Sequence, residues 1–309
     1  MEGSTEIREI LIPLDGSGTA EWAVPTAVAI ARQTGARLHL LLVHASLARI
    51  FPDVTATGYM DDWEDRQRER EDEYVRGVAE RLKAAGLRTV AETATGDTVS
   101  ELVDRIARMD LAVMTAHGWA GPDRAWLGHV ADAVVHHVRR PVIVVRAERG
   151  AAPEDPTDQQ AGFQRVFVAT DGSPAARVAE WHGEQMARLF DAHLTLFRAV
   201  RAPAGPSSPY IPHAATLDRQ AVAEWEREAR EYLDARAAAI QGIDLSTRME
   251  TTYHAARAIL DAAMEEDADL VAVGTHRDSR LARAVLGSVA DKVVRGIRTP
   301  VLIAHADAS

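Results

Sequence analysis

Glycines at turn positions are the residues of this sequence whose spacing points most directly to chemistry. In the first half, Gly118 is followed by nine residues and then by Gly128. In the second half, Gly274 precedes the pair Gly287-Ser288. Glycine lets main-chain N–H groups approach phosphate oxygens without a Cβ in the way. A helix that starts at the last glycine adds unpaired N–H groups and a positive dipole end, which attract an anion. These features would suit phosphate binding, with Ser288 as a further donor.

The tripeptide Asp-Gly-Ser occurs at residues 15–17 and again at 171–173, each time after an apolar run. In open α/β sheets, ligands lie beyond the carboxyl ends of the strands, so such turns are candidate binding positions. A purely structural interpretation stays open, in which the aspartate organises the turn and Ser17 or Ser173 caps the next helix. The glycines could likewise serve turns and close packing without any ligand.

An internal repeat sets the frame for these residues. EILIPLDGSGTA at 9–20 matches RVFVATDGSPAA at 165–176, and residues 117–145 match 276–304 around a shared L-G-x-V-A-D motif. Two matching blocks in the same order predict a duplicated domain. Between them, residues 148–162 are rich in Pro, Gly, Asp and Gln and lack apolar periodicity. We therefore expect one domain at 1–147, a linker at 148–162 and a second domain at 163–309.

Strand and helix patterns alternate within each half. In the first half the expected strands are 7–14, 37–44, 87–95, 111–116 and 142–146, and the expected helices are 18–34, 61–85, 98–108 and 128–138. The second half follows the same course, with an irregular loop at 201–217 and a charged helix at 218–241. Strands that alternate with helices imply right-handed crossovers and a parallel sheet. The sequence thus predicts an α/β fold with two tandem, doubly wound, five-stranded, Rossmann-like domains.

The arrangement resembles the universal stress protein family, over nearly the whole chain apart from the linker. Nucleotide-binding members of that family carry G-x2-G-x9-G-[ST] after strand four, in a fold of the adenine nucleotide alpha hydrolase type. The resemblance implies ATP as ligand, with or without Mg²⁺. It also implies that an aspartate after strand one contacts the ribose or a metal, and that the residue closing strand two flanks the adenine. The residues it implicates are Asp15, Ala45, Gly118, Gly128, His129, Asp171, Ala199, Gly274, Arg277, Gly287 and Ser288.

Both halves depart from the family pattern. The first has Thr115 in place of the first glycine and His129 in place of Ser or Thr, whereas the second has Arg277 in place of the middle glycine. Either the sites tolerate these residues or one or both have lost nucleotide. Arg277 could hold a phosphate or block the pocket. We expect it to hold one, because a triphosphate needs cations and the rest of the protein is acidic.

Composition and missing motifs narrow the function. The net charge of −11 argues against nucleic acid or an anionic membrane as partner, and the chain has no cysteine. The polar N-terminus is unlike a signal peptide, so we expect a cytoplasmic protein. There is no Walker A, G-x-S-x-G or early G-x-G-x-x-G motif, and adjacent His136 and His137 share no helix face for a metal.

The expected function is an ATP-binding, regulatory stress-response protein with little or no hydrolysis, no catalytic residues and no metal site of its own. One alternative is a nucleotide-free interaction module with degenerate phosphate sites, and a weak ATPase is another. Single-domain members of the resembled family commonly dimerise through their last strands. The resemblance therefore implies that 141–146 and 300–305 pair in an intramolecular pseudo-dimer, and a homodimer of the tandem chain is possible.

Overall fold

The structure of the 309-residue chain is a computed structural model. It describes residues 6–45, 58–116, 127–147, 153, 157, 162–202, 214–277, 284–285 and 287–306, and of these it gives the backbone alone for 58–61, 214–218, 276–277 and 284–285. The chain divides into two compact units, Met1–Gly162 and Phe163–Ser309. Each unit is a separate α/β domain and is described by itself.

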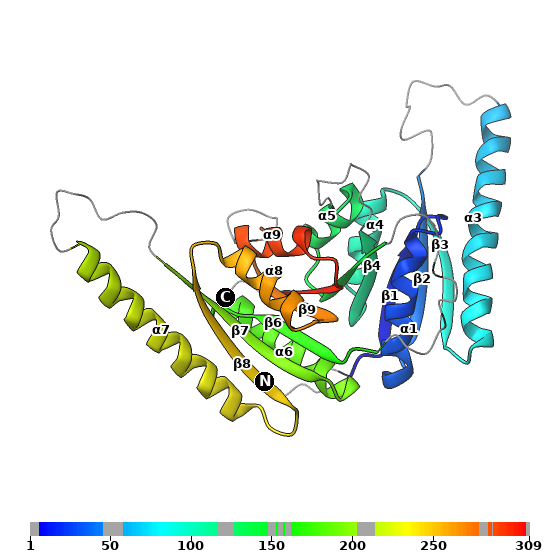
Figure 1. Cartoon of the computed structure of the whole chain (residues 1–309). Helices are drawn as coiled ribbons and strands as arrows, with labels where there is room; N and C mark the ends of the chain where they lie inside the picture. The colour runs from blue at the N-terminus through cyan, green and yellow to red at the C-terminus, as the bar shows by residue number, and fades with distance from the viewer. Residues whose placement is uncertain are drawn as a thin grey trace. The chain divides into compact units, whose positions relative to one another are not determined.

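The first unit is a parallel sheet with the strand order β3-β2-β1-β4-β5 (Figure 1). Its strands are β1 (Glu9–Leu14), β2 (Arg37–His44), β3 (Thr89–Thr95), β4 (Leu111–Ala116) and β5 (Val142–Arg146). Its helices are the 3-10 turn η1 (Ala20–Trp22), α1 (Ala23–Thr34), α3 (Gly58–Ala84), α4 (Thr98–Ile106) and α5 (His129–His137). The order reverses at β1 and β4, so the turns after these two strands lie on either side of a switch point.

The second unit repeats this order as β8-β7-β6-β9-β11. Its strands are β6 (Arg165–Ala169), β7 (His193–Arg201), β8 (Leu245–Thr252), β9 (Leu270–Arg277) and β11 (Val301–His305). Its helices are α6 (Pro174–Phe190), α7 (Ala214–Ala239), α8 (Ala255–Glu265) and α9 (Ser288–Gly296). One strand was not expected: β10 (Ala284–Val285) pairs antiparallel with the end of β9. The predicted α/β, Rossmann-like, doubly wound class is confirmed.

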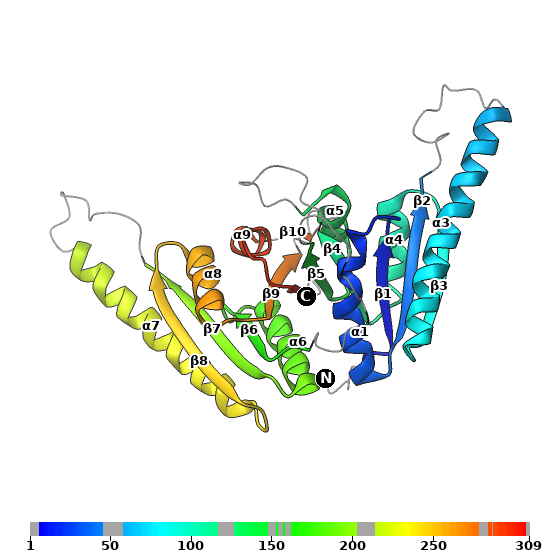
Figure 2. The same ribbon diagram turned by 45° about the vertical axis from the view of Figure 1, so that its right-hand side comes forward.

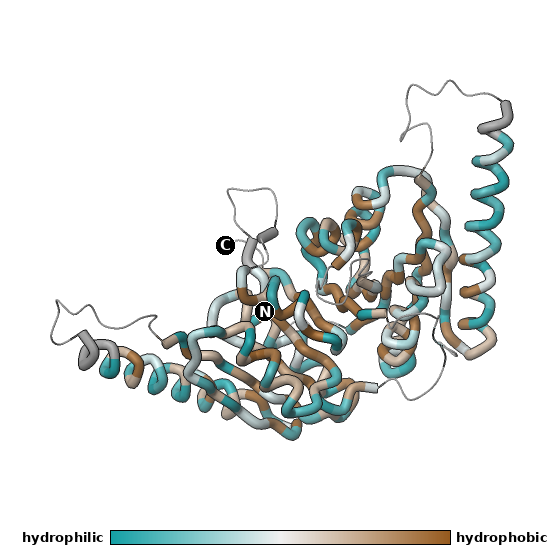
Figure 3. Tube along the Cα trace, turned by 45° about the horizontal axis from the view of Figure 1, so that its top comes forward, coloured by the Kyte–Doolittle hydropathy of each residue, from teal (hydrophilic) through white to brown (hydrophobic). Residues whose placement is uncertain are grey.

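The cores consist mainly of aliphatic strands covered by helices on both faces. All six residues of β4 are buried, and so are Ala27, Ile30 and Ala31 of α1. In the first unit α1 and α4 lie on opposite faces of the sheet (Figure 2). The long helices α3 and α7 are hydrophilic along most of their length, whereas the strands are hydrophobic (Figure 3). Among the described residues, no helix has both the length and the apolar character needed to cross a bilayer.

A carboxylate binds the backbone at the start of β1, and an equivalent carboxylate does the same at the start of β6. The carboxylate of Asp110, just before β4, accepts the backbone N–H groups of Arg8 and Glu9. Its counterpart Asp269, just before β9, accepts those of Gln164 and Arg165. Since the two strands on either side of the switch point are tied at their beginnings, their carboxyl ends, where the candidate sites lie, keep a fixed register.

The first helix of the first unit differs from the expected 18–34. A 3-10 turn at Ala20–Trp22 comes first, and the α-helix starts only at Ala23. Pro25 has no N–H to donate to the carbonyl of Glu21, so it is tolerated only in the first turn of a helix. Thr115 adds a second reason, because its buried hydroxyl donates to the carbonyl of Ala20 at 3.1 Å, a bond that favours the 3-10 turn over an α-helix there. Helix α7 starts earlier than expected, at Ala214 in place of 218.

Candidate functional site

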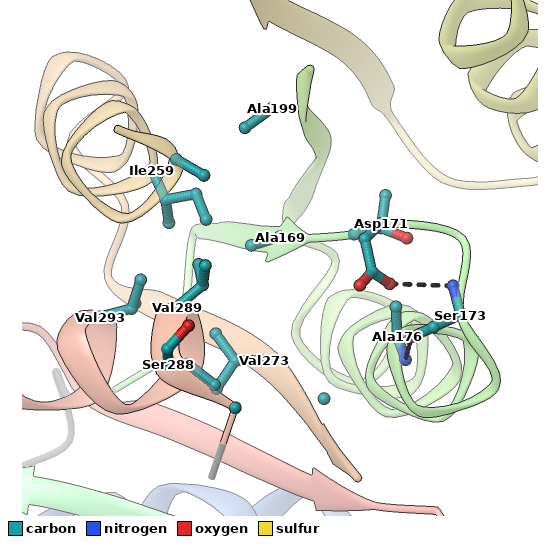
Figure 4. A pocket seen from close by; sticks show the side chains of 15 residues that line it. Ala169, Asp171, Ser173, Ala176, Ala199, Ile259, Val273, Ser288, Val289 and Val293 are labelled. Atoms are coloured by element: carbon teal, nitrogen blue, oxygen red, sulfur yellow. Dashed lines mark hydrogen bonds between the residues drawn. The ribbon is translucent and has the colours of Figure 1, made fainter. Parts of the chain in front are cut away.

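A cavity of about 270 Å³ lies at the carboxyl ends of β6 and β9 (Figure 4). It gathers all the second-half residues predicted to bind ligand except Arg277: Asp171, Ala199, Gly274, Gly287 and Ser288. The rest of its wall is mostly aliphatic, from residues such as Ile259, Val273 and Val293. A mostly apolar wall with a few polar groups is typical of a small-molecule site.

The Asp171 turn is rigid for reasons that the sequence shows only in part. Asp171 Oδ1 accepts the backbone N–H of Ser173 at 2.9 Å, and Ser173 Oγ caps α6 by accepting the N–H of Ala176. Gly172 between them has φ +79°, a conformation that favours glycine. The aspartate thus organises the turn and the serine caps the next helix, as the structural interpretation expected. Asp171 nevertheless faces the cavity (Figure 4).

A buried carboxylate anchors the same turn to the long helix α7. Glu180 of α6 is fully buried and accepts hydrogen bonds from the hydroxyls of Thr170 and Tyr232 and from Arg236 Nε. Thr170 lines the cavity and accepts the N–H of Gly172 at 3.1 Å. Burial and the neighbouring Glu180 raise the pKa of Tyr232, so its hydroxyl remains the donor at neutral pH. Sequence reasoning missed this network, although Thr170 directly precedes the Asp-Gly-Ser motif.

Helix α9 presents its N-terminus to the cavity. Gly287 is the N-cap, and the first intrahelical bond runs from the N–H of Asp291 to the carbonyl of Gly287 at 2.9 Å. The N–H groups of the first turn before Asp291 have no partner within the helix, as at any helix start. Gly287 and Ser288 are exposed, and a Cβ at Gly287 would meet nothing within 4 Å. Backbone donors and open space therefore lie together at this end.

Gly274 has a packing role, in line with the open structural interpretation of the glycines. A Cβ at this position would lie 2.3 Å from the carbonyl oxygen of Ala175 and 2.7 Å from the backbone nitrogen of Ala176. Both atoms belong to the first turn of α6. Gly274 therefore allows the start of α6 to approach β9, and this need for glycine exists without any ligand.

The first unit has a comparable cavity of about 380 Å³, which Asp15, Gly128 and His129 line. Asp15 accepts both the N–H and the hydroxyl of Ser17, so its turn matches that of Asp171. Glu71 of α3 also lines this cavity, and its carboxylate is held by Gln67 and by the buried His44 at 2.7 Å. Among the described residues, two carboxylates thus line the first cavity, whereas Asp171 alone lines the second.

Strand pairing shows which residues of β2 and β7 are equivalent at the positions expected to flank an adenine. Ile12 pairs with Leu40, and Val168, its equivalent in the repeat, pairs with Leu196. Three residues further on lie Val43 and Ala199, and each of them lines the cavity of its own unit. Ala45 does not line the first cavity, and its equivalent in this register is Arg201. The structure therefore places Val43 where Ala45 was expected.

Two predicted residues are described incompletely or not at all. Gly118 lies outside the described residues. Arg277 ends β9, and only its backbone is described there, paired with Ala284.

His136 and His137 bond through Nδ1 to the carbonyls of Asp132 and Ala133 of their own helix. Among the described residues, no cluster of three or more His, Cys, Asp or Glu side chains could hold a metal ion.

Comparison with known proteins agrees with this architecture. The model of the universal stress protein family matches residues 6–146 and again 162–305. A universal stress protein of Mycolicibacterium smegmatis is 26% identical over 303 residues, covering 95% of this chain and 96% of the relative. A putative universal stress protein of Staphylococcus epidermidis is 30% identical over 152 residues, or 48% of this chain and 88% of the relative.

Solved structures show the same fold in both units. The crystal structure of a universal stress protein from Archaeoglobus fulgidus superposes with a TM-score of 0.69, at 21% identity, and covers 96% of this chain and 98% of that chain. At this level of identity the likeness concerns the fold. The two family matches together span nearly all of the sequence outside the 147–161 segment. The chain therefore belongs to the universal stress protein family, as a tandem member with two family domains.

Proposed function

We propose that the second domain binds an adenine nucleotide, with ATP as the expected ligand, and that nucleotide occupancy is a regulatory signal. The observation that carries this proposal is the meeting of Asp171, Ala199, Gly274, Gly287 and Ser288 around one cavity. Aliphatic side chains would pack against the adenine, and the carboxylate of Asp171 would accept a ribose hydroxyl. The free N–H groups at the start of α9, with the Ser288 hydroxyl, would bind phosphate.

The first domain is the weaker candidate for a triphosphate. Its cavity is lined by Asp15 and Glu71, and two carboxylates oppose a polyanion. In the second domain, Ala229 stands three residues before Tyr232, as Glu71 stands three residues before Tyr74, and Val200 takes the place of His44. The first domain also has His129 where Ser288 opens α9. These differences favour the second domain as the nucleotide site.

ATP is proposed as a ligand and not as a substrate. Hydrolysis needs a base that is placed to activate water. Asp171 is the one ionisable residue among the described residues that line the second cavity, and one of its oxygens is occupied by the N–H of Ser173. Mg²⁺ would accompany ATP through the phosphates, and Asp171 is the carboxylate that the described part of the cavity wall offers it. Phosphate binding by the Arg277 guanidinium remains a prediction.

Thermal unfolding tests this proposal on the full chain. Saturating ATP with Mg²⁺ should raise the melting temperature by about 3 °C or more, because the ligand binds the native state selectively. Gly287→Val should abolish the rise, since it fills the open space at the start of α9 with a side chain. His129→Val, at the equivalent helix start of the first domain, is the matched control and should keep the rise.

The alternative function predicts a different outcome. A nucleotide-free interaction module would show the same melting temperature with and without millimolar ATP. Purified protein would then also release no adenine nucleotide on heat denaturation. Both results together would contradict the proposal and favour the interaction module.

A further inference from the structure

A second hollow, of about 420 Å³, adjoins the proposed nucleotide cavity of the second domain. We call it the arginine groove. The residues of its wall that matter here are Asp171, Arg198, Ala199, Arg201, Trp225 and Glu228. Asp171, just after β6, and Ala199, near the end of β7, also line the proposed nucleotide cavity (Figure 4). The two hollows therefore share a wall but have different chemistry.

The cations of the arginine groove lack carboxylate partners. Among the described residues, neither Arg198 nor Arg201 forms an ion pair, although most arginines of the neighbouring helix α7 do. The groove also contains the carboxylates Asp171 and Glu228, but neither pairs with the arginines, and Asp171 is directed to the N–H of Ser173. The groove is therefore lined by two arginines that have no carboxylate partner among the described residues.

Arg198 is held in place before any ligand arrives. Its guanidinium lies over the ring of Tyr232, 5.0 Å from the centroid, and the Tyr232 hydroxyl donates to the buried Glu180. A guanidinium stacked on an aromatic ring keeps its edge N–H groups free to donate. Because the stack is fixed by a buried network, little side-chain freedom would be lost when an anion binds.

Trp225 adds an aromatic surface to the same groove. This residue is 43% exposed, which makes it one of the most exposed large apolar residues among those described. An indole beside two guanidinium groups suits a ligand that combines a flat ring with a negative charge. The volume falls in the range of small-molecule sites, which is about 300 to 1,000 Å³.

The first domain lacks the two cations. In the register that aligns Leu40 with Leu196, Leu42 stands in place of Arg198 and Ala45 in place of Arg201. The arginines therefore do not follow from the shared fold, which both domains build without them.

We propose that the arginine groove binds a small aromatic anion, such as an aryl carboxylate or aryl phosphate, next to the nucleotide cavity. The carboxylate or phosphate would accept hydrogen bonds from Arg198 and Arg201, and the ring would pack on Trp225. This site does not depend on the proposed nucleotide function, because its ligand contacts other side chains.

Ligand-observed NMR on the nucleotide-free full chain tests the site with defined probes. Benzoate and phenyl phosphate represent the two anion types. Benzamide has the ring without the charge, and acetate and inorganic phosphate have the charge without the ring. We expect at least one of the two aromatic anions to bind at least tenfold more tightly than any of the three control compounds, and the stronger of the two identifies the preferred anion.

Matched variants locate the binding. The double variant Arg198→Leu with Arg201→Ala installs the residues of the first domain and should weaken binding of the aromatic anion at least tenfold. Trp225→Ala should weaken this binding about fivefold. Arg201→Ala alone, at an exposed position, should weaken it severalfold without loss of fold. Trp63→Ala, with an equally exposed indole on α3, and Arg227→Ala, outside the groove on α7, should leave it unchanged.

The proposal is overturned if neither aromatic anion binds the wild-type chain. It is also overturned if benzamide or the ring-free anions bind equally well, or if the groove variants bind like wild type. Melting curves of each variant without ligand identify any loss of folding. Failure of ATP to bind would contradict the proposed function but would leave this result unaffected, since no nucleotide is present.

Discussion

The two domains share a strand order but differ where the first helix contacts the sheet, at α1 and β4 in the first domain and at α6 and β9 in the second. One residue of the strand accounts for much of the difference. In the second domain Gly274 lets the first turn of α6 touch β9, so α6 starts at Pro174, directly after the Asp-Gly-Ser turn. In the first domain Thr115 occupies the equivalent position, and a 3-10 turn separates the Asp-Gly-Ser turn from α1. A side chain on the strand and an α-helical first turn exclude each other here.

This contrast shows that a glycine within a ligand-binding pattern can be required by packing. Gly274 and Gly287 both belong to the pattern, yet a Cβ at Gly274 would meet backbone and a Cβ at Gly287 would meet open space. Substitutions at the two positions should therefore separate folding from ligand binding. Gly287 is the position that tests the ligand, and Gly274 is the position that tests the packing.

The largest expected effect comes from Gly274→Thr, which places the residue of the first domain in the second. Its Cβ would overlap backbone atoms of Ala175 and Ala176, which no change of rotamer can relieve. We expect a loss of about 3 to 4 kcal/mol in the free energy of unfolding of the second domain. Calorimetry should show that the corresponding transition moves down by about 10 °C.

The reciprocal change is the control for this prediction. Thr115→Gly removes the hydroxyl that donates to the Ala20 carbonyl, without creating a clash, and should cost about 1 to 2 kcal/mol. Equal losses for Gly274→Thr and Thr115→Gly would show that the close approach of α6 to β9 is not specific to the second domain.

A smaller effect should appear as acid sensitivity of the second domain. His182 of α6 packs against Trp181, and burial lowers its pKa to about 4 from the ordinary value of 6.5. The folded domain thus keeps His182 neutral, while the unfolded chain takes up a proton below about pH 6.5. Stability is therefore fully present above that pH and is lost as the pH falls towards 4, by about 2 to 3 kcal/mol in all.

The first domain again supplies the matched residue, since the buried Thr26 stands at the position of the half-buried His182. His182→Thr should reduce the difference in denaturant midpoint between pH 7 and pH 4, because the variant loses the pH-dependent stability that His182 contributes. An unchanged difference in midpoint between these two pH values would contradict the assignment. The comparison of variant with wild type at each pH cancels the contribution of the other titrating groups.

The sequence predicts the strands well because apolar runs and the internal repeat both mark them. The expected bounds of β2, β4 and β5 agree with the structure, and the helix starting near Gly128 follows from the Gly-His and Gly-Ser turns. The late start of α1 was missed, although Pro25 gave a signal for it in the sequence. The short strand β10 is only two residues long and has no periodicity to read.

The site was harder to predict where it depends on contacts between distant elements. Asp171 and Ser288 could be found from local motifs, but Glu71, Glu180 and Arg198 reach their positions only through the packing of α3, α6 and β7. Ala45 and Ala199 were expected to be equivalent, whereas strand pairing makes Val43 the equivalent of Ala199. Pairing of the last strands in an intramolecular pseudo-dimer stays a prediction.

Hydrogen exchange with and without ATP and Mg²⁺ tests the central claim most directly, which is that the second domain holds the nucleotide at the start of α9. The N–H groups of Ser288, Val289 and Ala290 have no intrahelical acceptor, so they should exchange fast in free protein and slowly when phosphate accepts from them. The account predicts new protection at 287–291 and around 171–176, and none at 128–132 of the first domain. Protection confined to 128–132, or no protection in either domain at saturating ATP, would contradict it.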